Sequence, residues 1–228
     1  MGFGWRTRGV LTYIWAGCVI LAPQMHITQL SQGVDNVIQF TLVLASGEYV
    51  TANHYENSDL FWALRGGGGG TFGVVVTVTY RTHDILPLTL FYSNATFSSP
   101  EMAKTFVTEF IRIHPNLSDA GWGGYSSWSN LTFTSTYLAL NISVAEANAT
   151  MTPFIDYAQS VVNNPKSFQY LFLPFSSFYE FYDTFFATAG GSGGLLELTS
   201  RLMSRKMAQE RPEEVAEMTL ATDGLSFS

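Results

Sequence analysis

The chain has very few of the residues that build disulfide, zinc or nucleic-acid sites. Its 228 residues include one cysteine, Cys18, so no disulfide can form within the chain and no zinc site can rest on a set of thiolates. Charged residues make up only 13%, and the net charge of −7 leaves no basic stripe that could neutralise phosphates. We therefore expect no disulfide framework and no nucleic-acid partner.

The sequence is also short of long apolar runs. The run from Val10 to Ala22 spans thirteen residues, which is too short to cross a bilayer. Arg6 and Arg8 precede it, as in a signal peptide, but Pro23 is a poor cleavage context. The segment is therefore either a signal peptide or an unusual N-terminus, and no membrane span is expected.

Common catalytic and metal-binding patterns are missing too. No Gly-x-Ser-x-Gly nucleophile elbow occurs. The four histidines have no partner at helical spacing and no neighbouring cysteine, which predicts surface or capping roles and no metal site. These histidines are His26, His54, His83 and His114.

What the sequence does have is a run of five glycines, Gly66 to Gly70, placed between a short helical pattern and a strand pattern. Glycine has no Cβ, so another molecule can lie directly on the backbone N–H groups. A Rossmann fingerprint has the opposite order, strand then helix, and a phosphate loop needs a lysine where Thr71 stands. From the residues alone, a flexible linker remains an equal alternative.

The flanking segments predict regular structure. The residues from Val37 to Leu44, the Ser46-Gly47 turn and Tyr49 to Thr51 predict a β-hairpin. Asn57 and Ser58 offer an N-cap for a short helix that the glycines end. The β-branched run from Val74 to Tyr80 predicts a buried strand.

Residues 33–83 resemble part of the FAD-binding domain of FAD-linked oxidases of the vanillyl-alcohol oxidase (PCMH) type. The likeness is strongest over Asn57-Ser-Asp-Leu-Phe-Trp-Ala-Leu-Arg-Gly-Gly-Gly-Gly-Gly-Thr-Phe-Gly-Val-Val. Within that family the likeness is to secreted fungal relatives of berberine bridge enzyme. The resemblance implies FAD and places a cofactor role on Gly33, Asp35, Gly66, Gly67, Gly68, Gly69, Gly70, Phe72, Gly73, Val74 and Val75. For Asp35, an ordinary turn before a strand is equally compatible.

The same resemblance implies a division of the chain. Residues 1–32 are unmatched, 33–86 correspond to the second half of the FAD domain, 87–210 to the substrate domain, and 211–228 to an incomplete tail. The histidine and cysteine that attach flavin in the family have no counterpart, which implies non-covalent FAD. The implied partners are a small-molecule alcohol, sugar or amine and an electron acceptor such as oxygen, with hydride passing to the flavin. No catalytic base is identified.

The second half predicts an α+β fold, with helices covering one face of an antiparallel sheet. Ser99 should cap a helix that ends before Pro115, and Ser143 with Glu146 should form a capping box for a helix that breaks near Pro153. Strands are expected over 121–125, 130–137 and 138–142. The aromatic residues from Phe178 to Phe186 predict an amphipathic helix, either packed on the sheet or lining a pocket.

Flat aromatic rings suit a sugar or aromatic substrate, which makes Trp122, Tyr125 and Tyr137 candidates, with plain sheet packing as the alternative. Arg201 is a candidate for a substrate oxygen, with a structural salt bridge as the alternative. Five glycosylation sequons, at Asn94, Asn116, Asn130, Asn141 and Asn148, favour a secreted glycoprotein. A flavin oxidoreductase is therefore the first functional hypothesis, and a secreted, non-enzymatic binding glycoprotein is the second.

Overall fold

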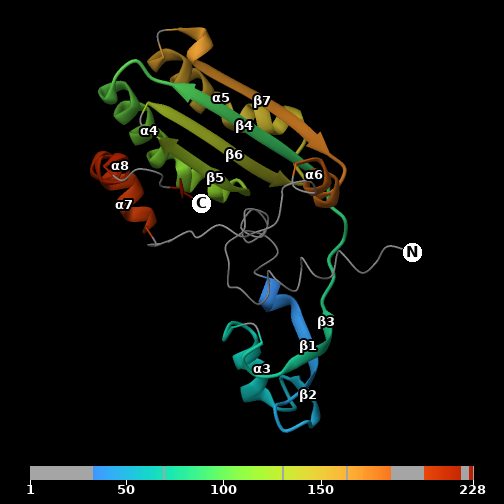
Figure 1. Ribbon diagram of the computed structural model, residues 1–228. Coiled ribbons are helices and arrows are strands. Elements are labelled where there is room, and N and C mark those ends of the chain that lie inside the picture. The colour runs from blue at the N-terminus through green and yellow to red at the C-terminus, as the bar shows by residue number, and fades with distance from the viewer. Residues whose placement is uncertain are drawn as a thin grey trace. The chain divides into compact units, whose positions relative to one another are not determined.

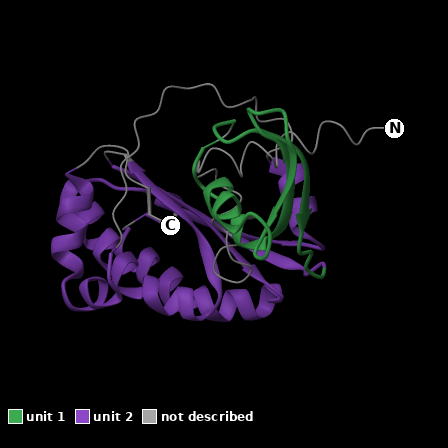
Figure 2. Ribbon diagram, turned by 90° about the horizontal axis from the view of Figure 1, so that it is seen from below, with its two compact units in different colours: residues 1–84 green, residues 85–228 purple. Residues whose placement is uncertain are grey.

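The computed structural model describes residues 33–68, 70–129, 131–162, 164–185, 203–221 and 226–227. The chain divides into two compact units, residues 1–84 and 85–228 (Figure 2). The segment 1–32, with Cys18 and His26, lies outside the described residues. Each unit has its own core and is treated separately below.

The first unit is a three-stranded antiparallel sheet with one helix. After a 3-10 turn, η1 (Gly33–Asn36), strands β1 (Val37–Val43) and β2 (Tyr49–Asn53) form the expected hairpin, and β3 (Val74–Tyr80) pairs with the other side of β1. The strand order is β2-β1-β3 (Figure 1). Both the hairpin and the third strand were predicted correctly.

Helix α3 (Ser58–Leu64) covers the inner face of this sheet. Phe61 and Leu64 are buried with Phe40 and Leu42 of β1 in one apolar cluster. Asn57 is the N-cap residue, as predicted, but its side chain does not cap the helix: the backbone of Asn57 is left-handed, with φ 48°, and its side-chain amide donates to the carbonyl of Thr51 at 2.7 Å. The helix is therefore fixed to β2 through its N-cap residue and to β1 through its apolar side.

Strand β3 is not the buried strand that its composition predicts. Val74 is 71% exposed and Val76 is 54% exposed, whereas Val75 and Val78 pack into the cluster under α3. The strand lies at the edge of the sheet and α3 covers one face only, so alternate side chains point away from the core. β-Branched composition identified the strand but not how many of its faces are covered.

The second unit confirms the α+β prediction. Its sheet is antiparallel throughout, with the order β7-β4-β6-β5-β8 (Figure 1). The strands are β4 (Leu88–Thr96), β5 (Trp122–Ser129), β6 (Thr132–Leu140), β7 (Phe168–Phe175) and β8 (Ser226–Phe227). Strand β4, which lies between β7 and β6, was not predicted, and the two segments expected over 130–142 form the single strand β6.

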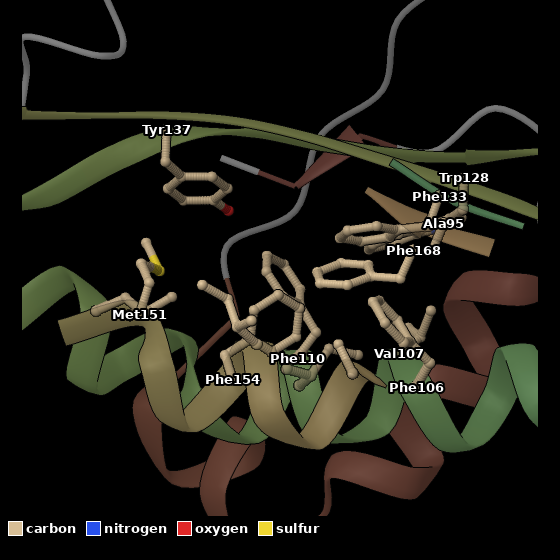
Figure 3. Close-up of a cluster of buried hydrophobic side chains, with 14 of the residues drawn as sticks. Ala95, Phe106, Val107, Phe110, Trp128, Phe133, Tyr137, Met151, Phe154 and Phe168 are labelled. Atoms are coloured by element: carbon tan, nitrogen blue, oxygen red, sulfur yellow. The ribbon is translucent and has the colours of Figure 1, made fainter. Parts of the chain in front are cut away.

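Helices α4 (Pro100–Asp119) and α5 (Val144–Val161) pack on one face of this sheet. Between the layers lies a core rich in aromatic rings, in which Phe106 and Phe110 of α4 meet Phe133 of β6 and Phe154 of α5 at centroid distances of 5.0 to 5.5 Å (Figure 3). Helices α7 (Arg205–Glu210) and α8 (Pro212–Leu220) pack on α4. A short 3-10 turn, η2 (Pro165–Ser167), precedes β7.

Helix α6 (Phe178–Phe185) follows β7 and packs on it, as predicted for the aromatic segment. Phe181 is buried, and its ring lies 5.6 Å from that of Phe175 in an edge-on contact. The last residue of the expected helix, Phe186, lies outside the described residues.

Both expected proline breaks are wrong. Helix α4 continues through Pro115 to Asp119, and α5 continues through Pro153 to Val161. An internal proline costs about 3 kcal/mol, but both helices bury apolar residues beyond their proline, such as Leu117 and Ile155, and so keep packing on either side of it. The two predicted N-terminal signals, the Ser99 cap and the Ser143–Glu146 capping box, are confirmed.

In the part of the chain that is described, no helix combines the length and the hydrophobicity needed to cross a membrane.

Candidate functional site

The glycine run forms a defined loop between α3 and β3. The N–H of Arg65 donates to the carbonyl of Trp62 at 3.2 Å, and the N–H of Gly67 donates to that of Ala63 at 2.8 Å, so the loop begins as a tight turn on the end of the helix. Gly68 (φ 102°), Gly70 (φ 74°) and Gly73 (φ 152°) have backbone angles that side-chain-bearing residues rarely adopt. A flexible linker would need neither the turn nor these angles.

Two glycines are needed because the loop packs closely against its surroundings. A Cβ on Gly67 would lie 2.6 Å from the carbonyl oxygen of Ala63 and from the ring of Phe72, and a Cβ on Gly73 would lie 2.6 Å from the carbonyl oxygen of Val43. The loop backbone therefore lies close against α3 at Gly67 and close against β1 at Gly73, with no room for a side chain.

Two other glycines face open space. A Cβ on Gly66 or Gly70 would meet no atom within 4 Å, so the backbone there can be approached by a ligand. Glycine backbone that is open at these two positions and closely packed at Gly67 and Gly73 is compatible with contact to the diphosphate of a dinucleotide. Gly69 lies outside the described residues.

The structure groups some of the predicted cofactor residues and separates others. Phe72, Gly73, Val74 and Val75 continue directly from the loop into β3. Gly33 and Asp35 lie in η1, at the far end of β1, because Val37 pairs with Tyr80 while Val43 pairs with Val74. Seven residues of strand, roughly 20 Å, separate the two ends, so Gly33 and Asp35 do not share one contact point with the loop.

In the second unit, two of the aromatic candidates lie in the core. Trp122 and Tyr137 are buried on the face of the sheet that α4 and α5 cover, and Figure 3 shows Tyr137 pointing from the sheet toward the helices. The Tyr137 hydroxyl is 3.0 Å from Nε2 of His114. Both rings therefore fill the interior, as in the sheet-packing alternative.

His114 corrects the prediction that the histidines are surface or capping residues. It lies in α4 beside Tyr137, and burial lowers the pKa of its imidazole. The helical spacing of Phe110 and His114, whose rings lie 5.9 Å apart, could have placed it on the inner face. Among the described residues no cluster of three or more potential metal ligands occurs.

Tyr125 is different because it lies on the face of the sheet opposite α4 and α5. Side chains alternate along β5, so Tyr125 faces away from Trp122, next to Thr136 on β6, which in turn pairs with Tyr92 on β4. The Tyr125 hydroxyl is buried and has no hydrogen-bond partner among the described residues. Burial raises the pKa of this phenol, so it stays protonated at neutral pH.

Sequence reasoning missed the residues around Tyr125. The next row of the same face contains Ser127 and Thr134, whose hydroxyls lie 2.7 Å apart, with Asn94 beyond them on β4. Without β4 in the predicted sheet, this row could not be assembled. Arg201 lies outside the described residues.

Comparisons with known proteins agree with this architecture. An FAD-linked oxidoreductase of Arthroderma benhamiae is 37% identical over 208 residues, covering 85% of this chain and 35% of that protein. The FAD-linked oxidoreductase asqF of Emericella nidulans is 65% identical over 54 residues, covering 24% of this chain and 9% of that protein. The crystal structure of the VAO-type flavoprotein MtVAO615 from Myceliophthora thermophila superimposes with a TM-score of 0.71 at 25% identity, over 86% of this chain and 36% of that one.

The chain is similar to part of a VAO-type FAD-linked oxidoreductase. It spans about a third of the length of its curated relatives, 35% in each of two proteins of Arthroderma benhamiae. A search against models of protein families finds no match. A non-enzymatic binding glycoprotein is not favoured by any of these relatives.

Proposed function

We propose that this chain contributes an FAD contact and a substrate-binding sheet to an enzyme that oxidises a small alcohol, sugar or amine. The observation that carries the proposal is the glycine loop, closed by contacts at Gly67 and Gly73 and open at Gly66 and Gly70. Bound there, FAD would accept hydride from the substrate and later pass its electrons to an acceptor such as oxygen. The residues of the loop hold and orient the cofactor.

The contact between this loop and FAD is non-covalent. Glycine, valine and Phe72 have no nucleophilic side-chain atom that could form a bond to the flavin ring. Backbone N–H groups can donate to phosphate oxygens, and such charge-assisted hydrogen bonds are the stronger kind. The fit is therefore that of a backbone cradle.

Substrate binds on the face of the five-stranded sheet opposite α4 and α5. Tyr125 supports this placement because its hydroxyl is buried and has no partner among the described residues. A protonated phenol acts as a hydrogen-bond donor, so Tyr125 orients an oxygen or nitrogen of the substrate and does not serve as the base. Trp122 and Tyr137 pack on the other side of the sheet, against α4 and α5, and do not contact the substrate.

The protein is further proposed to be secreted and glycosylated. Asn116, Asn141 and Asn148 are exposed, and Asn141 occupies a turn with φ 56° directly after β6. Asn94 is partly buried within β4, and Asn130 lies outside the described residues. Expression in a eukaryotic secretory host, followed by enzymatic removal of N-glycans, should increase the electrophoretic mobility of the chain; unchanged mobility would contradict glycosylation.

The oxidoreductase proposal is tested by adding FAD to the purified full chain. We expect saturable quenching of flavin fluorescence, and bleaching of the bound flavin when an alcohol, sugar or amine substrate is added without oxygen. A folded chain that does not bind FAD would refute the cofactor contact. Glycan binding without flavin would instead support the non-enzymatic alternative.

A further inference from the structure

The direction of α3 works against anion binding at the glycine loop. The loop follows the carboxyl-terminal end of the helix, with Arg65 as the last capping residue. That end of a helix has a partial negative charge, equivalent to about half an elementary charge in a long helix. A diphosphate at this loop would therefore meet an unfavourable helix dipole, the reverse of the arrangement in a Rossmann fold.

Arg65 lies at the carboxyl-terminal end of α3, where the helix dipole is unfavourable for a phosphate. The guanidinium carbon of Arg65 lies 4.5 Å from the centroid of the Phe61 ring, and Phe61 is itself buried. Stacking on a fixed ring limits the freedom of the arginine side chain at the start of the loop. Arg65 is thus held in place beside the open backbone of Gly66.

The charge of Arg65 has no counterpart in the described residues. Its Nε is buried and has no hydrogen-bond partner there, and Arg65 makes none of the ion pairs, all of which lie in the second unit. A partly buried guanidinium without a carboxylate is unfavourable by itself. An anionic ligand would supply the missing partner.

We propose that Arg65 is the cation that offsets the α3 dipole and pairs with the diphosphate of FAD at the glycine loop. This inference rests on the proposed function. The guanidinium donates hydrogen bonds to phosphate oxygens, while the loop N–H groups contact the same group from the backbone side. Arg65 is a cofactor-binding residue with no part in hydride transfer.

The test compares three ligands on the full chain: FAD, ADP, which keeps the diphosphate without the flavin, and riboflavin, which keeps the flavin without phosphate. Dissociation constants are measured by calorimetry at low and high salt for the wild type, Arg65→Met, Arg65→Lys and the control Arg81→Met. Arg81 is an exposed cation at the opposite end of β3. Thermal unfolding verifies that each variant is folded.

We expect Arg65→Met to weaken FAD and ADP binding by about tenfold to a hundredfold, as for the loss of a hydrogen bond to a charged group. Riboflavin binding should be unchanged, Arg65→Lys should lose less, and Arg81→Met should match the wild type. The salt dependence of FAD binding should be weaker in Arg65→Met.

Two results would overturn the inference while leaving the proposed function intact. One is wild-type affinity of Arg65→Met for FAD and ADP. The other is an equal loss for riboflavin, which would mean that Arg65 shapes the loop and does not touch phosphate. If the folded wild type binds neither FAD nor ADP, the proposed cofactor contact fails, and the role of Arg65 fails with it.

Discussion

The substitution Gly66→Ala should separate the stability of the glycine loop from its ability to bind FAD. Gly66 is exposed, its φ lies outside the left-handed region, and a Cβ there would meet no atom within 4 Å. Alanine therefore fits the folded backbone and restricts the unfolded chain. The free energy of unfolding of the first unit should rise by about 0.4 to 1 kcal/mol.

The same methyl group would occupy the space in which the cofactor is proposed to lie. If it prevents one N–H group from reaching a phosphate oxygen, the loss is about 1.5 to 3 kcal/mol for a hydrogen bond to a charged group. The dissociation constant for FAD should then increase by about tenfold to a hundredfold. A more stable protein with weaker FAD binding is the expected combination.

Gly67→Ala is the matched comparison, one residue along the same loop. Its Cβ would lie 2.6 Å from the carbonyl oxygen of Ala63, so this variant should lose stability, by about 1 to 3 kcal/mol. Thermal unfolding measures stability, and quenching of flavin fluorescence measures FAD binding. The reasoning is refuted if Gly66→Ala binds FAD as tightly as the wild type, or if it is destabilised as much as Gly67→Ala.

Three further predictions concern the second unit. Tyr125→Phe should leave the melting temperature unchanged or higher, because the lost hydroxyl has no partner among the described residues, whereas Tyr137→Phe should cost about 1 kcal/mol by removing the bond to His114; the opposite order in thermal melts would contradict the assigned contacts. Burial lowers the pKa of His114 in the folded state, so as the pH falls the unfolded chain binds the extra proton first. The stabilising contribution of neutral His114 is therefore present above pH 6.5 and is lost as the pH falls from 6.5 through the lowered pKa of the folded state. The free energy of unfolding measured in urea should decrease over this pH range, and His114→Gln should reduce the decrease. Gly124→Ala would place a Cβ 2.1 Å from the carbonyl oxygen of Thr136, so it should destabilise the unit by about 3 kcal/mol, and a native melting temperature would refute the close strand contact.

Local signals were the part of the fold that the sequence predicted best. The capping box of Ser143 and Glu146 needs only neighbouring residues, and the structure contains both of its hydrogen bonds. The hairpin of β1 and β2 likewise depends on a short turn, with Gly47 at φ 84°. Such signals act within a few residues, so no knowledge of tertiary packing is required.

Predictions that depended on tertiary packing were less successful. Pro115 and Pro153 are helix breakers by local preference, yet buried residues on both sides keep each helix continuous. Strand β4 was missed although Leu88, Leu90, Phe91 and Ala95 are buried. Its side chains are covered on both faces over the first half, so it lacks the simple alternation that marks a half-exposed strand.

The candidate substrate residues show why composition could not choose among aromatics. Trp122 and Tyr125 are three positions apart on β5, and an odd separation along a strand puts them on opposite faces. Which face is the interior depends on α4 and α5, whose packing the sequence of β5 does not contain. Tyr125 remains the candidate because it lies on the face opposite these helices and its buried hydroxyl has no partner among the described residues.

For the glycine run, the composition points to a special role of the segment but does not determine the geometry of its backbone. Five consecutive glycines are compatible with a linker or a cradle, and the choice depends on contacts that glycine itself does not make. The turn to Ala63 and the close approach to Val43 come from α3 and β1, so the neighbouring elements determine the shape of the loop. Once that shape is fixed, the carboxyl end of α3 favours a nearby cation beside any bound diphosphate, and Arg65 is the residue that the same turn positions there.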